Sequence, residues 1–297
     1  MNMRTVLATI GLLSLVLNGC GAADVRTDAS AYAPTGTVHI YEAPSVTIHT
    51  LVSGLDGVMT STHIIEGQSQ LVVVDTHLLR EDAFALRAYA DALGKPIERV
   101  VVTHGHPDHY FGLEAFEDVP TWGTAHTITH MQQRHRAHHR GHVERVGDAV
   151  TDEVRFPQRT LAEGETTIDG VRYVFEEMPN LEDVWQTVIT LPDEGVLIVQ
   201  DLAGSGTHLF LGGQRFERWA GRARHLAEDT SIEYVLIGHG PPGDRSVLTD
   251  TADYLDEAAV ILAASPDADA WLASMQQRWP EYEGLLVLQV ALQFLFD

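Results

Sequence analysis

Four potential metal ligands stand within six consecutive positions, directly after a run of β-branched residues. They are His104, His106, Asp108 and His109. The first two are separated by one residue, so in an extended loop both imidazoles point the same way and could bind one ion. The aspartate and the last histidine follow Pro107, where a helix could begin, and would face a second ion. Nitrogen and carboxylate oxygen together suit zinc, iron or manganese better than magnesium or calcium.

The strand before these ligands must position them. Residues 97–103 contain the β-branched run, which predicts a buried strand. A strand that ends at a cleft is a common way for an α/β sheet to build a site. The alternative is a polar loop that happens to be rich in histidine, and it leaves the order of the ligands and the preceding strand unexplained.

The rest of the chain alternates between strand and helix patterns. Further strands are expected at residues 37–42, 45–52, 59–66, 71–74, 171–177, 187–191, 196–200 and 234–238. Helices are expected at residues 81–93 and 215–229, and in most of the chain beyond residue 242. The apolar helix expected at residues 285–296 is too short to span a membrane. We expect it to pack on the core or on another subunit.

Composition limits the class of protein. A chain of 297 residues with 44% hydrophobic content can bury one large core or two small ones. The formal net charge of −23 disfavours nucleic acid as a partner, because phosphate binding needs a basic surface. The acid excess is expected to serve solubility rather than cation binding. A small-molecule substrate is therefore the expected partner.

The His-x-His-x-Asp-His pattern after a buried strand resembles the signature of the metallo-β-lactamase superfamily, whose members are mostly binuclear metal hydrolases. The resemblance covers residues 37–250 and includes strands that end at Asp75 and Asp201 and the Gly-His-Gly loop around His239. It implies an α/β fold, a four-layer αβ/βα sandwich built of two similar halves. Residues 251–297 would then be C-terminal helices that pack on this domain or on a partner subunit, with a dimer possible.

The sequence departs from the family pattern at one metal ligand. Family members usually carry a histidine about twenty residues before the bridging aspartate, and this region has none. Glu182, nineteen positions before Asp201, resembles the glutamate that replaces this histidine in the alkylsulfatase-like branch. Asn180, Glu177 and Asp183 are the alternatives, as is an incomplete first site. A carboxylate ligand would weaken the ion as a Lewis acid and could shift preference towards manganese or iron.

The family layout implies two divalent ions, most simply zinc. The ligands would be His104, His106 and Glu182 for the first ion, Asp108, His109 and His239 for the second, and Asp201 as the bridge. A bridging hydroxide would attack a carboxylic, lactone, sulfate or phosphate ester, with Asp108 as a catalytic orienter or proton carrier. Asp75 would hold the loop of residues 104–109 (the metal loop) through hydrogen bonds. A mononuclear iron oxidoreductase and a non-catalytic metal-binding lipoprotein are the alternatives.

Two further sets of histidines are candidates for function. His208 follows Asp201 by seven positions and is expected to contact substrate as a catalytic-site residue. Residues 126–142 carry six histidines and three arginines, which could form a lid, an accessory metal site, a pH-responsive patch or a solvated helix. Trp122, Trp185 and Trp219 could line an apolar pocket, although core packing is the default for each.

The first residues look like a targeting segment. Arg4 precedes an apolar run at residues 6–17, and the sequence up to Cys20 resembles a bacterial lipobox. Residues 1–19 are therefore expected to be a lipoprotein signal peptide, and residues 20–36 a flexible tether after lipidated Cys20. A simple secretory signal is the alternative. The expected location is the bacterial cell envelope, on the periplasmic or outer side, with the lipid anchored in a membrane.

Overall fold

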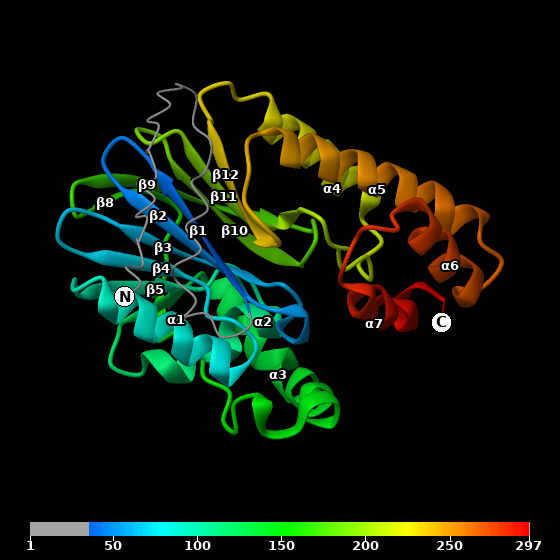
Figure 1. Ribbon diagram of the computed structural model, residues 1–297, viewed down its shortest axis with the longest axis horizontal. Helices are drawn as coiled ribbons and strands as arrows, with labels where there is room; N and C mark the ends of the chain where they lie inside the picture. The colour runs from blue at the N-terminus through cyan, green and yellow to red at the C-terminus, as the bar shows by residue number, and fades with distance from the viewer. Residues whose placement is uncertain (1–35, 297) are drawn as a thin grey trace, which may run out of the picture.

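The computed structural model describes residues 36–296, which form two β-sheets flanked by helices (Figure 1). The first sheet contains, in spatial order, β1 (Thr37–Glu42), β2 (Thr47–Val52), β3 (Ser61–Glu66), β4 (Leu71–Val74), β5 (Ile97–Val101), β6 (Thr121–Gly123) and β7 (Arg159–Thr160). The second contains β12 (Tyr234–His239), β11 (Val196–Gly204), β10 (Trp185–Leu191), β9 (Val171–Pro179) and β8 (Gly164–Ile168). The α-helices are α1 (Arg80–Ala92), α2 (Pro107–Tyr110), α3 (Ala125–Val146), α4 (Phe216–Ala227), α5 (Ser246–Ala264), α6 (Ala268–Arg278) and α7 (Leu285–Leu295).

The two sheets pack face to face through an apolar layer. Ile65 and Val74 of the first sheet belong to the same buried cluster as Phe175, Ile198 and Leu236 of the second. All four residues of β4 are buried, because helices cover the other face of the first sheet. This is why the segment lacks an apolar–polar alternation.

Helices cover the outer face of each sheet. Val73 and Val100 of the first sheet pack with Leu86 of α1 and with Phe111 and Phe116 of the 3₁₀ segment after α2. Figure 1 shows α4 and α5 beside the second sheet. The order is therefore helix, sheet, sheet, helix, and the predicted αβ/βα sandwich with C-terminal helices is confirmed.

The C-terminal helices share the core of the second half. Trp271 and Met275 of α6 and Leu288 of α7 are fully buried in the cluster that contains Trp219 and Leu255. Within residues 36–296, no helix is long and apolar enough to cross a membrane.

The element boundaries differ from expectation at a few positions. Strand β3 begins at Ser61 rather than at residue 59, because Val58 and Met59 have φ values of 58° and 55° and close a 3₁₀ turn. Strand β5 ends at Val101 rather than at residue 103, and the chain leaves the sheet before its metal-binding loop. The short strands β6, β7 and β8 were not predicted. At three, two and five residues they offer little pattern.

Candidate metal centre

Five chain segments deliver the expected metal ligands to one place between the two sheets. His104 and His106 follow β5, and α2 carries the next two ligands. Glu182 lies between β9 and β10, Asp201 lies in β11, and His239 ends β12. The structure therefore brings together all seven residues that the sequence suggested as ligands.

A backbone irregularity aims Asp201 into this place. The pairing of β11 with β12 shifts register on both sides of Gln200, whose φ is 45°. The side chain of Asp201 then crosses the backbone of Gly238, where an added Cβ would lie 1.9 Å from Asp201 Oδ1. Position 238 therefore requires glycine, and this accounts for the first glycine of the Gly-His-Gly loop.

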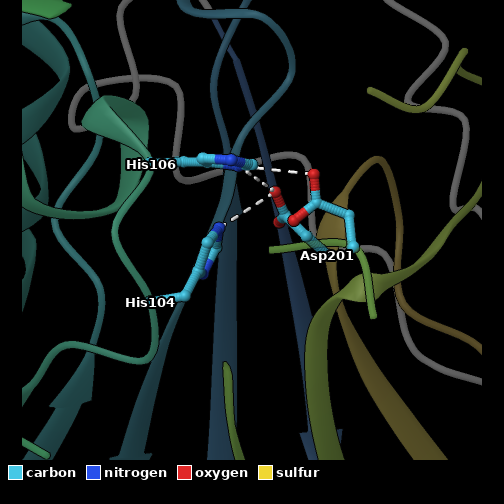
Figure 2. A group of neighbouring side chains, drawn as sticks. His104, His106 and Asp201 are labelled. Atoms are coloured by element: carbon cyan, nitrogen blue, oxygen red, sulfur yellow. Dashed lines mark hydrogen bonds and ion pairs between the residues drawn. The ribbon is translucent and has the colours of Figure 1, made fainter. Parts of the chain in front are cut away.

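The first group of ligand atoms comprises His104, His106, Glu182 and Asp201, whose atoms all lie within 4.8 Å of one another. Figure 2 shows both histidines of the metal loop directed towards Asp201. Nε2 of His104 and Nδ1 of His106 lie 3.2 and 3.5 Å from Asp201 Oδ2. Nδ1 of His106 also lies 3.5 Å from Glu182 Oε1. Two imidazoles and two carboxylates thus converge on one point.

The second group comprises Asp108, His109 and His239. Nε2 of His109 lies 3.0 Å from Asp201 Oδ1, and Nε2 of His239 lies 3.3 Å from Asp201 Oδ2. Both nitrogens also approach Asp108 Oδ2, at 3.3 and 3.5 Å. Asp201 therefore contacts histidines of both groups and occupies the position between them.

The buried polar atoms of this cluster fit a site for cations. Four of them form no hydrogen bond: His109 Nε2, Glu182 Oε1, Glu182 Oε2 and Asp201 Oδ1. Burial raises the pKa of Glu182 well above its usual value, and neighbouring carboxylates raise it further. Burial also opposes ionisation of Asp201, but His109 and His239 hold its pKa well below the usual range. Buried polar atoms without hydrogen bonds are costly, and bound divalent ions would satisfy these atoms.

Asp75 supports the metal loop through hydrogen bonds. Its carboxylate accepts hydrogen bonds from the Thr103 amide and hydroxyl at 2.9 and 2.8 Å and from Gln200 Nε2 at 2.5 Å. It also lies 2.8 Å from His109 Nδ1, which fixes the ring with Nε2 facing the cluster. These hydrogen bonds fit a supporting role for Asp75, which also forms a third group of potential ligands with His104 and His109.

The sequence did not lead us to the residues that hold Asp75 in place. Gln200 also lies 2.7 Å from His63 Nε2, which extends the network into the first sheet. Burial lowers the pKa of His63 to about 4, so this histidine is neutral. The signal available in the sequence was a glutamine in an apolar strand, directly before Asp201. The structure shows that this glutamine is fully buried.

The carboxylates near Glu182 have other partners. Asp183 Oδ2 accepts a hydrogen bond from the Gly105 amide at 3.1 Å and lies 3.3 Å from His130 Nδ1. Glu177 lies 2.7 Å from His126 Nδ1 at the start of α3. Of the three carboxylates considered for the third ligand of the first group, Glu182 is the one placed in that group.

His208 lies in a different environment from the expected one. Its ring is buried, with Nδ1 3.0 Å from the Tyr254 hydroxyl and with Trp279 and Tyr282 as ring neighbours. It belongs to none of the ligand groups found in residues 36–296. The expected substrate contact is therefore corrected to a packing role, because the loop after β11 turns away to pack on the C-terminal helices.

The histidine-rich segment forms α3, which packs beside the metal loop. His126 stacks on Trp185, His130 contacts Asp183, and His139 Nε2 lies 2.7 Å from the Thr151 carbonyl oxygen. In the part of the chain that the structure describes, no α3 histidine joins a group of three ligands, so an accessory metal site is not supported.

The three tryptophans do not share one pocket. Trp122 lies beneath the guanidinium groups of Arg99 and Arg159, Trp185 stacks on His126, and Trp219 is buried in the second half. Packing accounts for each of them.

Comparisons with known proteins agree with this geometry. The sequence model of the metallo-β-lactamase superfamily matches residues 55–264, and the chain belongs to this superfamily. An alkyl/aryl-sulfatase of Saccharomyces cerevisiae is 29% identical over 192 residues, which is 53% of this chain but only 29% of that protein's length. A metallo-β-lactamase from Pontibacter korlensis has a similar structure, with a TM-score of 0.57, 21% identity and coverage of 74% of this chain and 99% of that one.

A second similar structure is the metallo-β-lactamase FIM-1 from Pseudomonas aeruginosa in its mono-zinc form. It has a TM-score of 0.57 and 18% identity, and the match covers 76% of this chain and 97% of that one. At such identities these structures establish the shared fold.

Replacing Glu182 tests the unusual ligand. We expect about two divalent ions per chain in the wild type, and Glu182→Gln should lose about one of them because the first group loses a charged donor. Glu177→Gln is the matched control, since this nearby glutamate binds α3 instead. Elemental analysis of protein purified without chelators measures both. Equal metal content in the Glu182 variant and the wild type would contradict the assignment.

Replacing His208 tests its packing role. Burial lowers the pKa of His208 to about 4, below the ordinary 6.5, so the folded state binds fewer protons than the unfolded state in this range. The stability contributed by the neutral ring is present above pH 6.5 and is lost as the pH falls towards 4. When the pH is lowered from 7 to 5, the free energy of unfolding should therefore fall by about 1 kcal/mol less in His208→Gln than in the wild type. The metal content of the variant should be unchanged. Urea unfolding at both pH values measures this, and equal losses would refute it.

Proposed function

We propose that this protein is a metal-dependent hydrolase that cleaves an ester-type bond of a small molecule with two divalent ions. Zinc is the first expectation for these ions, with manganese or iron as alternatives. The observation that carries the proposal is the placement of Asp201 between two groups of imidazole and carboxylate ligands. Asp201 would bridge the ions, His104, His106 and Glu182 would hold the first, and Asp108, His109 and His239 the second.

The ions, when bound, would lower the pKa of a water and polarise the ester oxygen. The residues of the chain would orient the reactants. Asp108 is suited to orient the attacking water or to carry a proton, because its side chain is 13% exposed and accepts a hydrogen bond from the Thr60 hydroxyl at 2.8 Å. Asp75 would keep His109 in the orientation that binding requires.

Two observations favour an ester that carries negative charge. The matched sulfatase supports a sulfate ester as the first candidate, ahead of carboxylic, lactone and phosphate esters. The four arginines of α3 also form no ion pair within residues 36–296, although the protein as a whole is strongly acidic. One of them, Arg145, lies within electrostatic range of Asp108 and would attract an anionic substrate.

Loss of hydrolysis on removing ligands tests this function. His106→Ala and His109→Ala should each lower kcat/KM by at least about 100-fold towards the best of p-nitrophenyl sulfate, phosphate and acetate. The control is His126→Ala, an exposed histidine at the start of α3, which should retain activity. Full activity in both ligand variants would contradict the assignment. A single iron ion per chain would favour the mononuclear oxidoreductase, and bound metal without hydrolysis would favour a non-catalytic lipoprotein.

We also propose that a lipid on Cys20 anchors the protein to a membrane of the bacterial cell envelope, with residues 20–36 as a tether. Residues 1–35 lie outside the described part of the chain, and the lipobox-like sequence before Cys20 supports this proposal. A dimer through α7 and the absence of nucleic-acid binding are further proposals, the second supported by the charge of −23.

Cys20→Ser tests the anchor, because Cys20 is the only cysteine of the chain. We expect the wild-type protein to sediment with membranes and the variant to lose most of this association. Fractionation with immunodetection measures the difference. Unchanged association of the variant with membranes would refute the lipid anchor.

A further inference from the structure

The candidate metal centre is accessible on one side. The side chains of His106, Asp108 and His239 are 18%, 13% and 11% exposed, whereas those of Glu182 and Asp201 are 1% and 5% exposed. His104 and His109 are fully buried. A substrate must therefore approach from the side of the three exposed ligands.

An aromatic pair extends outward from this accessible side. The ring centroid of Phe210 lies 5.5 Å from that of His106, with the planes at 87°. The ring of Phe294 continues from Phe210, at 5.7 Å and 86°. Phe294 remains 43% exposed. An apolar surface thus begins at a metal-ligand candidate and ends in solvent.

The two phenylalanines are held together by the packing of the C-terminal region on the loop after β11. Gln214 Nε2 donates a hydrogen bond to the Phe294 carbonyl oxygen at 2.7 Å. A Cβ at Gly212 would lie 2.5 Å from Phe210 and 3.0 Å from Phe294. The backbone of Glu283, just before α7, pairs with Gly206 and His208. These contacts fix the two phenylalanines relative to each other, and together their rings form an apolar wall.

Helix α7 has more apolar surface than its packing uses. Nine of its eleven residues are apolar, yet only Leu288 and Ala291 are fully buried. This helix lies beyond residue 264, where the match to the superfamily ends. It brings apolar surface to the site by way of Phe294.

We propose that Phe210 and Phe294 form an apolar subsite that binds the organic group of the ester next to the metal centre. The inference rests on the proposed hydrolase function and adds to it the determinant of substrate size. The occupant is an apolar group of the substrate, because the wall is continuous with the ligand at which the substrate must arrive. Each methylene placed on this wall is expected to improve binding by up to about fourfold.

Binding of non-hydrolysable anions tests the subsite without requiring turnover. The probes are alkyl sulfonates and alkyl carboxylates with two or eight carbons, measured by calorimetry on the metal-loaded protein. In the wild type, the eight-carbon compounds should bind at least about tenfold more tightly than the two-carbon compounds. In Phe294→Ala this preference should largely disappear, and Phe294→Leu should retain part of it.

Phe84→Ala is the matched control. Phe84 is 48% exposed on α1, and truncating it removes the same atoms from the other half of the fold. This control should keep the wild-type preference for chain length. The subsite is overturned if the wild type shows no such preference, if Phe294→Ala keeps it, or if its loss in that variant accompanies dissociation of a dimer measured by sedimentation.

The test separates the subsite from the proposed function. A preference for chain length that depends on Phe294 supports the subsite even if no ester is hydrolysed, and in that case only the hydrolase proposal fails. Hydrolysis without such a preference retains the hydrolase proposal and overturns the subsite.

Discussion

The buried carboxylate of Asp201 is the constraint on which the rest of the structure depends. Its oxygens lie 3.0 to 3.5 Å from nitrogens of four histidines that come from both halves of the fold. A group of this charge density is costly to bury, and it is stable only where every surrounding group is held in place. Asp75, Thr103 and Gln200 provide that hold on the side of the metal loop. The sandwich therefore places histidines from both halves of the fold around the carboxylate of Asp201.

The two sides of the accessible edge differ in chemistry. Arg145 of α3 lies within electrostatic range of Asp108 and carries positive charge. Phe210 is near His106 and presents an apolar surface that α7 extends. Such an arrangement suits a substrate with a negative group at the metal centre and an apolar group beside it. The superfamily fold hosts many reactions, so these chain-specific neighbours carry more information about the substrate than the fold does.

Much of the fold and the ligand cluster could be predicted from local patterns. Short runs of apolar and β-branched residues predicted β3, β4, β5, β11 and β12. The spacing of residues 104–109 predicted the four ligands of the metal loop. The short strands β6 and β7 could not be predicted, because three and two residues leave no periodicity to detect. His208 was misjudged because its distance in sequence from Asp201 says nothing about the direction in which the intervening loop turns.

The sequence by itself determined which residues can bind metal and the order in which strands deliver them, because ligand type and strand patterns are local properties. Only the tertiary structure decided which carboxylate completes the first group. Glu177, Glu182 and Asp183 are close in sequence and alike in chemistry, and they differ in what the fold places opposite each one. The same holds for Phe294, which lies 188 positions after His106 (294 − 106 = 188) and reaches the site because the buried residues of α6 and α7 fix the C-terminal helices on the core. Contacts over such separations depend on packing, and packing is a property of the whole chain.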